Sequence, residues 1–263
     1  MDIPLEVRGL TKLYGTRRGI VDASFDVGPG EIVGLLGPNG CGKSTTLHCI
    51  TDYHSPTSGE ALIAGIPHHR PSAKDRLGFL PDDLPLPESL SGRELLMLHA
   101  HLRPSLQLDT GYEVLEVFDL MDHLDRYVGD YSHGMKRKLQ LVLALAHRPT
   151  LLVLDEPLRG LDPEAAILTN TVISSFAGSD CGVLIATHDL AAAETTCDSV
   201  VIVNQGGVVA RGAPADLKRE HDAASLEEVF LTLTGIRSGL SAKLRRLALT
   251  LDINHPLVLG GTS

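Results

Sequence analysis

A glycine-rich segment in the first fifth of the chain has the spacing of a phosphate-binding loop. It lies between an apolar run at residues 32–36 and a segment of helical character at residues 43–50. Glycines let backbone N–H groups converge on phosphate oxygens, and the N-terminus of the next helix adds a favourable dipole. In this pattern Lys43 reaches the β- and γ-phosphates, and the Ser44 hydroxyl is a ligand of Mg²⁺. The sequence therefore predicts a nucleotide site formed by Gly37, Pro38, Asn39, Gly40, Cys41, Gly42, Lys43, Ser44 and Thr45.

Two acidic residues follow a second apolar run. Residues 151–154 read Leu-Leu-Val-Leu, and Asp155 and Glu156 come directly after them. If the run is a buried parallel strand, both carboxylates lie at the carboxyl edge of the sheet, where a phosphate-bound magnesium would sit. We expect Asp155 to hold Mg²⁺, directly or through water, and Glu156 to orient or deprotonate an attacking water. The alternative is a strand end with two solvated acids, which the upstream phosphate-binding loop disfavours.

The elements that must position these residues alternate between strands and helices, with one interruption. Strand patterns dominate up to about residue 80, helical spacing follows, and strand patterns return from residue 151. This order predicts an α/β core with a helical insertion at about residues 82–147. The expected strands are 5–10, 21–27, 32–36, 60–64, 77–80, 151–154, 183–187 and 200–203, and the expected helices are 43–50, 91–102, 113–120, 134–147 and 163–176.

The composition excludes several classes of protein. The 263 residues carry a net charge of -10, which argues against a broad basic surface for nucleic acid. The four cysteines include no C-x-x-C pair, so a zinc framework is not indicated and a reducing compartment is the simplest interpretation. The first ten residues lack the features of a signal peptide, and no stretch approaches the roughly 18 apolar residues of a spanning helix. If the protein acts at a membrane, we expect another chain to cross it.

The order of the motifs is similar to that of the ATP-binding cassette (ABC) ATPases. Residues 131–135, Tyr-Ser-His-Gly-Met, resemble the signature of this family, which is usually Leu-Ser-Gly-Gly-Gln. Residues 160–162, Gly-Leu-Asp, resemble its D-loop, and His188 resembles its switch histidine. Tyr14, in Lys-Leu-Tyr-Gly, matches the aromatic residue that stacks on adenine, although a tyrosine in a short strand often only packs.

The resemblance implies a fold and a domain plan. The expected fold is α/β: a P-loop NTPase (RecA-like) core with an antiparallel β subdomain and an inserted α-helical subdomain. One nucleotide-binding domain would span residues 1–235, followed by a C-terminal extension at 236–263. Leucines in this extension share one helical face, which suits either a membrane-surface helix or a terminal helix packed on the core.

The resemblance also implies a head-to-tail dimer with two ATP molecules at its interface. Each ATP would meet the signature segment of the opposite copy at Ser132 and Gly134, and Asp162 would belong to the same site. Ser132 is also a good N-cap, and the helix N-terminus that follows it favours phosphate. His188 would contact the γ-phosphate and place the water against Glu156. For an isolated histidine a packing or surface role is simpler, but the order of the motifs favours the catalytic role.

Three departures from the family pattern stand out. His133 and Met135 replace a glycine and the glutamine of the usual signature. Asp82 occupies the place of the Q-loop glutamine; it could still bind Mg²⁺ or water, but it adds negative charge near the triphosphate. Cys41 replaces a small residue inside the phosphate-binding loop, and we hypothesise that its oxidation blocks nucleotide binding.

The details of the motifs resemble exporter-type cassettes whose permease is a separate chain. The resemblance therefore implies an ATP-hydrolysing subunit, cytoplasmic and peripheral at the inner face of the cell membrane. Its partners would be a transmembrane permease and a second nucleotide-binding domain, in a homodimer, with no nucleic acid. The alternative is a soluble non-transport ABC ATPase in an assembly or repair process. The neighbouring His68 and His69 are expected in an exposed loop, with no transition metal.

Overall fold

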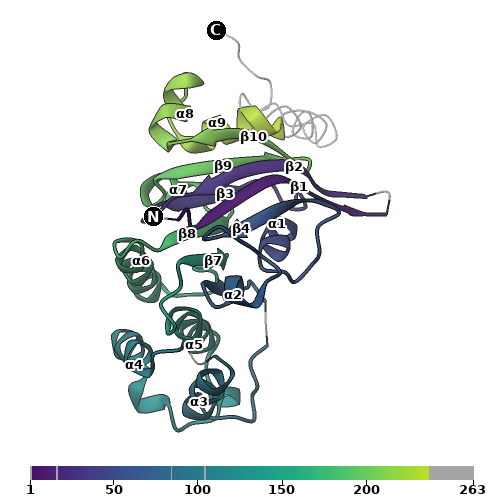
Figure 1. Ribbon diagram of the computed structural model, residues 1–263. Helices are drawn as coiled ribbons and strands as arrows, with labels where there is room; N and C mark the ends of the chain where they lie inside the picture. Colours follow the sequence, from purple (N-terminus) through teal and green to yellow (C-terminus); the bar gives the residue numbers. More distant parts are fainter. Residues whose placement is uncertain (1, 16, 84, 104, 237–263) are drawn as a thin grey trace, which may run out of the picture.

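The computed structural model describes residues 2–15, 17–83, 85–103 and 105–236 (Figure 1). Two β-sheets and a group of helices make up this part of the chain. The C-terminal extension expected from the sequence lies outside the described residues, apart from residue 236. None of the described helices has the length and apolar character needed to cross a membrane.

The central sheet has six strands in the order β10-β9-β3-β8-β7-β6. Five of them are parallel and β10 is antiparallel to β9. Every residue of β3 and of β7 is buried, which explains why both segments read as unbroken apolar runs. Their bounds are β3 Ile32–Leu36, β6 Leu77–Leu80, β7 Leu151–Asp155, β8 Gly182–Thr187, β9 Ser199–Asn204 and β10 Gly207–Gly212.

A second, antiparallel sheet has four strands in the order β2-β1-β4-β5. Helix α1, Lys43–Ile50, packs between the two sheets, and one hydrophobic cluster joins its residues Leu47 and Ile50 to both of them. This sheet is the antiparallel β subdomain that the resemblance implied. Its strands are β1 Leu5–Tyr14, β2 Arg17–Val27, β4 Ser58–Ile63 and β5 Ile66–Pro67.

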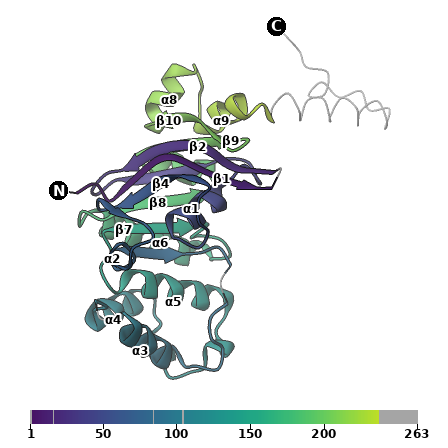
Figure 2. The same ribbon diagram turned by 45° about the vertical axis from the view of Figure 1, so that its right-hand side comes forward.

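The helices between β6 and β7 form the predicted insertion. Figures 1 and 2 show α5 between the central sheet and the pair α3 and α4. The Ser91 hydroxyl accepts a hydrogen bond from the backbone N–H of Glu94, and the Glu94 carboxylate accepts one from the backbone N–H of Ser91, a capping box that fixes where α3 begins. The bounds are α3 Gly92–Leu102, α4 Leu108–Val117, the short 3₁₀ turns η1 Met121–His123 and η2 Val128–Asp130, and α5 His133–Leu145.

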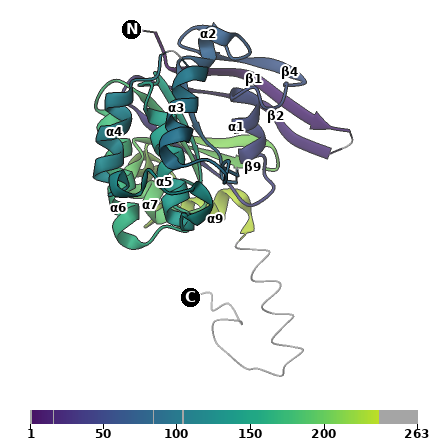
Figure 3. The same ribbon diagram turned by 90° about the horizontal axis from the view of Figure 1, so that it is seen from below.

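The remaining helices flank the sheets. Seen from below, the insertion lies across one side of the molecule, and the β1–β2 hairpin projects from another (Figure 3). These helices are α2 Pro71–Lys74, α6 Pro163–Ala177, α7 Leu190–Thr196, α8 Pro214–Glu220 and α9 Leu226–Thr234.

Two expectations from the sequence need correction. The helix expected at residues 113–120 begins at Leu108 and ends at Val117, because Asp119 has a left-handed backbone with φ of 55°. His68 does not lie in an exposed position: it is 6% exposed, and its Nδ1–H donates to the carbonyl of Ala61 at 3.2 Å. Only His69 is exposed as expected.

The close packing of α5 on β6 predicts that added volume at this contact destabilises the protein. A Cβ atom on Gly78 of β6 would collide with the carbonyl oxygen of Ala144 and approach Leu152 to 3.0 Å. We expect Gly78→Ala to lower the free energy of unfolding by about 1–3 kcal/mol, as overpacking does. Gly111 of α4 is the matched control, since its added Cβ would meet its nearest neighbours at 3.5 Å. Gly111→Ala should stabilise by about 0.5–1 kcal/mol. Urea denaturation measures both, and equal effects would contradict the packing argument.

Candidate functional site

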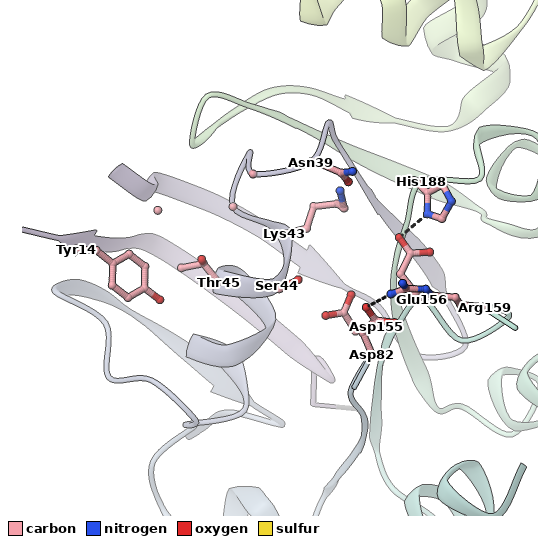
Figure 4. Close-up of a pocket in the computed structure, with 13 residues that line it drawn as sticks. Tyr14, Asn39, Lys43, Ser44, Thr45, Asp82, Asp155, Glu156, Arg159 and His188 are labelled. Atoms are coloured by element: carbon pink, nitrogen blue, oxygen red, sulfur yellow. Dashed lines mark hydrogen bonds and ion pairs between the residues drawn. The ribbon is translucent and has the colours of Figure 1, made fainter. Parts of the chain in front are cut away.

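The phosphate-binding loop, the Asp155–Glu156 pair and His188 meet in one cleft of about 700 Å³ at the carboxyl edge of the central sheet (Figure 4). Six of the nine residues of the predicted phosphate-binding loop line it; Gly37, Pro38 and Cys41 do not. Gly19 and Arg159 also line it, and neither was predicted from the sequence. The lining residues are Tyr14, Gly19, Asn39, Gly40, Gly42, Lys43, Ser44, Thr45, Asp82, Asp155, Glu156, Arg159 and His188.

The phosphate-binding loop runs from the end of β3 to the start of α1. Gly42 has φ of 116°, a conformation that residues with a side chain rarely adopt, and a Cβ there would collide with the carbonyl of Gly19. Lys43 is only 8% exposed, and its Nζ donates to the carbonyl of Gly37 at 2.6 Å. The loop therefore holds its own lysine in place beside the cleft.

Cys41 points away from the cleft. The side chain is 4% exposed, and burial raises the pKa of its thiol. Because the thiolate is the reactive form, burial makes this cysteine a poor target for oxidants. The hypothesis that its oxidation blocks nucleotide binding stays a prediction.

Asp155 and Glu156 end β7 in two different environments. Asp155 is 4% exposed, and burial raises its pKa, as do the charges of Asp82 and Glu156, against a hydrogen bond from Ser44 and the charge of Lys43. Glu156 has a left-handed backbone with φ of 48°, which is strained for a residue with a side chain. Its N–H still donates to Ala186 on β8 at 2.9 Å, so the sheet holds the strained turn in place.

Glu156 is fixed by two neighbours from the end of β8. The Nδ1–H of His188 donates to its Oε1 at 2.8 Å, and the Thr187 hydroxyl donates to its Oε2 at 3.2 Å. The Glu156 side chain is 15% exposed and that of His188 is 69% exposed. The arrangement presents a carboxylate, oriented by a histidine, to the same cleft that Lys43 enters (Figure 4). Such a pair can position a water and accept its proton.

Arg137 of α5 holds the backbone that carries Asp155 and Glu156, although the sequence did not identify it as a site residue. It is 4% exposed, and its guanidinium donates to the carbonyls of Pro81, of Asp155 at 2.5 Å and of Glu156 at 2.8 Å. One buried side chain thus ties the ends of β6 and β7 to the helix that follows the signature-like segment. The available signal was a basic residue on the apolar face of α5, in helical register with the buried Leu141 and Ala144.

Asp82 and Arg159 form an ion pair in the lining of the cleft. The Nη1 of Arg159 lies 2.6 Å from Oδ2 of Asp82. Oδ1 of Asp82 is buried and has no hydrogen-bond partner among the residues that the structure describes. Arg159 could have been suspected from its position three residues after Glu156, but nothing in the sequence indicates that it meets Asp82.

The residues expected to contact nucleotide from the signature and D-loop lie outside the cleft. Ser132 accepts a hydrogen bond from the N–H of Met135 at 3.2 Å and caps α5. Asp162 accepts one from Ala165 at 2.9 Å and caps α6. Gly134 lies in the first turn of α5. Within one chain, none of the three lines the site of the phosphate-binding loop.

Tyr14 lies at the end of the cleft away from His188 (Figure 4). Its side chain is 43% exposed, Lys12 Nζ lies 5.4 Å from the ring centroid, and His54 approaches it edge-on. An exposed aromatic ring beside a phosphate-binding loop suits the stacking role expected for it.

The oxygens of this cleft suit Mg²⁺. Ser44, Asp155 and Asp82 line one cleft, and Ser44 hydrogen-bonds the Asp155 carboxylate. Mg²⁺ in proteins commonly takes one or two carboxylates and completes its shell with substrate phosphates and water.

The chain is similar to known proteins over most of its length. Residues 20–159 match the family described as ABC transporter. The chain is 35% identical to the Nod factor export ATP-binding protein I of Burkholderia orbicola strain AU 1054, over 86% of this chain and 76% of that protein. It is 34% identical to the lipopolysaccharide export system ATP-binding protein of Escherichia coli K12, over 82% and 94%. A solved ATP-binding subunit of an ABC transporter superposes with a TM-score of 0.82 at 34% identity, over 88% and 99%.

The contacts of Arg137 predict a loss of both stability and turnover. Arg137→Met keeps an unbranched apolar stem but removes the guanidinium that donates to the carbonyls of Pro81, Asp155 and Glu156. We expect the free energy of unfolding to fall by about 2–4 kcal/mol, and ATP turnover to fall because the Glu156 backbone is no longer held. Lys136→Met is the control, since its pairing with Glu88 is exposed and should contribute less than about 1 kcal/mol. Urea denaturation and steady-state hydrolysis measure the two effects; equal behaviour of both variants would contradict the assignment.

Proposed function

This chain belongs to the ABC transporter family as an ATP-binding and ATP-hydrolysing protein, and on this premise we propose that it powers an exporter whose permease is a separate chain. The main support for catalysis is the Glu156–His188 hydrogen bond in the cleft that Lys43 also lines. The main support for export is that both relatives named above are export ATP-binding proteins.

We infer that the loop and Lys43 hold the triphosphate. When a nucleotide binds, Lys43 exchanges the Gly37 carbonyl for phosphate oxygens, and backbone N–H groups of the loop complete the cradle. Ser44, Asp155 and Asp82 are the residues that would hold Mg²⁺, which supplies neutralisation of the phosphate charge when bound. The Tyr14 ring stacks on the adenine at the other end of the cleft.

Hydrolysis then depends on Glu156. Its carboxylate orients a water for in-line attack on the γ-phosphorus and accepts the proton that the water loses, while the bond to the ADP oxygen breaks. The Nδ1–H bond from His188 keeps the carboxylate in place. When both nitrogens of the ring are protonated, this bond also leaves the Nε2–H of His188 free to donate to a γ-phosphate oxygen.

A second cassette completes the site. Ser132 and Asp162 cap helices whose N-termini lie outside the cleft of their own chain, so they are available to the nucleotide of another copy. We propose a head-to-tail homodimer in which each ATP lies between the phosphate-binding loop of one chain and the signature-like segment of its partner.

The permease docks in the groove between α3, α5 and β6. This groove, of about 530 Å³, is lined largely by apolar side chains, including Phe79, Leu86, Leu98 and Leu102. Leu102 is 75% exposed and Leu98 is 41% exposed, so the groove presents adjacent apolar side chains to solvent, as interaction sites do. A short permease segment that faces the cytoplasm would fill the groove, and the chain would lie at the inner face of the cell membrane.

Replacement of the catalytic carboxylate tests the hydrolytic mechanism. Glu156→Gln keeps the shape of the side chain but removes the proton acceptor, so we expect turnover to fall by about 10²-fold or more. ATP should still bind, and the variant should accumulate as an ATP-bound dimer in size-exclusion chromatography. Glu116→Gln, at an exposed position of α4 outside the cleft, should hydrolyse ATP at the rate of the unmodified protein. Turnover of Glu156→Gln within threefold of that rate would refute the role of Glu156.

Co-purification from gently solubilised native membranes tests the partner. We expect a multi-spanning protein in stoichiometric amount, identified by mass spectrometry, and Leu102→Asp should lose it while it still binds ATP. Val117→Asp is the control, an equivalent change at an exposed apolar residue of α4 that does not line the groove. Recovery of the chain with soluble partners alone would refute the exporter and favour an ATPase of an assembly or repair process.

A further inference from the structure

We propose that Arg159 is a phosphate-binding residue of the cleft, and that Asp82 holds its guanidinium there until a nucleotide binds. This inference rests on the proposed function, because it assigns Arg159 a contact with the same triphosphate. It adds a cation that the signature, the phosphate-binding loop and the Asp-Glu pair do not include.

The charges of the cleft call for such a cation. Three carboxylates, Asp82, Asp155 and Glu156, line it together with the cations Lys43 and Arg159. A triphosphate brings further negative charge into the same space, so each cation that faces it favours binding.

The geometry of the pair allows an exchange of partners. Arg159 is 64% exposed and follows Glu156 by three residues, with its N–H bonded to the Glu156 carbonyl at 3.1 Å. The Asp82 backbone is held by Arg137, which donates to the carbonyls of Pro81 and, at 3.4 Å, of Asp82. Asp82 is therefore the fixed partner, and the long side chain of Arg159 is the one that can turn toward a phosphate.

Stability alone does not account for the pair. An ion pair this exposed changes the folding equilibrium by less than about fivefold. Arginine recognises phosphate with charge-assisted, often bidentate hydrogen bonds, which typically strengthen binding by about tenfold or more. The residue type and its place on the cleft wall thus suit a ligand better than they suit a structural brace.

A double-mutant cycle tests whether Arg159 contacts the phosphates or only neutralises the charge of Asp82. The full chain and its Arg159→Gln, Asp82→Asn and doubly substituted variants are titrated with a fluorescent ATP analogue in EDTA, which removes any contribution of Asp82 as a metal ligand. We expect Arg159→Gln to weaken binding by about tenfold. Asp82→Asn should strengthen it by about threefold, because Arg159 loses its competing partner.

The double variant decides between the two roles. If Arg159 contacts the phosphates, the double variant stays several-fold weaker than the unmodified chain. If Arg159 only neutralises Asp82, removal of both charges restores the unmodified affinity, and that result would overturn the proposal. Arg159→Lys should recover part of the affinity, since it restores charge without the bidentate geometry.

Matched controls exclude a general charge effect. Arg93 and Asp125 form a similar pair at 2.7 Å in the helical insertion, away from the cleft lining. Arg93→Gln and Asp125→Asn change the net charge by the same amounts and should leave the affinity unchanged; an equal response would overturn the inference. Absence of binding by the unmodified chain would instead refute the proposed function, whereas normal binding with inert Arg159 variants would refute this inference alone.

Discussion

The parallel register of three neighbouring strands is the constraint on which the site depends. Leu36, the last residue of β3, pairs with Thr187 of β8, and Asp155, the last residue of β7, pairs with Ala186. The segments that follow β3, β7 and β8 therefore leave the sheet side by side, at its carboxyl edge. One emerges as the phosphate-binding loop, one as Glu156 and one as His188. A shift of one residue in either pairing would turn these side chains to the other face of the sheet and separate Glu156 from His188.

The same edge concentrates negative charge, and the structure offsets it with cations from three directions. Lys43 comes from the loop, Arg159 from the turn after β7, and Arg137 from the helix below. Their roles differ with their burial. Arg137 is committed to backbone carbonyls, Lys43 has a weak neutral partner in the Gly37 carbonyl, and Arg159 is held by an acid that is itself short of partners. The cleft is thus arranged for a ligand that brings more negative charge.

Arg137 connects the helical insertion to the backbone of the cleft. It lies five residues after Ser132 on α5, and it contacts the end of β6 and the backbone on both sides of the Asp155–Glu156 peptide. Because α5 lines the groove proposed for the permease, a shift of this helix would act on both the groove and the catalytic backbone. Coupling through a rigid helix and buried hydrogen bonds needs only small displacements, since such contacts have few alternative arrangements.

The sequence by itself determined the α/β fold with its helical insertion, and it predicted the phosphate-binding loop and the role of Glu156. These depend on local pattern: a continuous apolar run indicates a buried parallel strand, and a glycine-rich turn before a helix indicates phosphate binding. The role predicted for His188 depends instead on the order of motifs that the family shares. Only the tertiary structure decided which distant side chains meet. Arg137 reaches residues more than a dozen positions away, Asp82 and Arg159 are 77 positions apart, and His68 is buried by a strand that precedes it. No periodicity records such contacts, because they are set by the packing of separate elements and by the need of buried polar groups for partners.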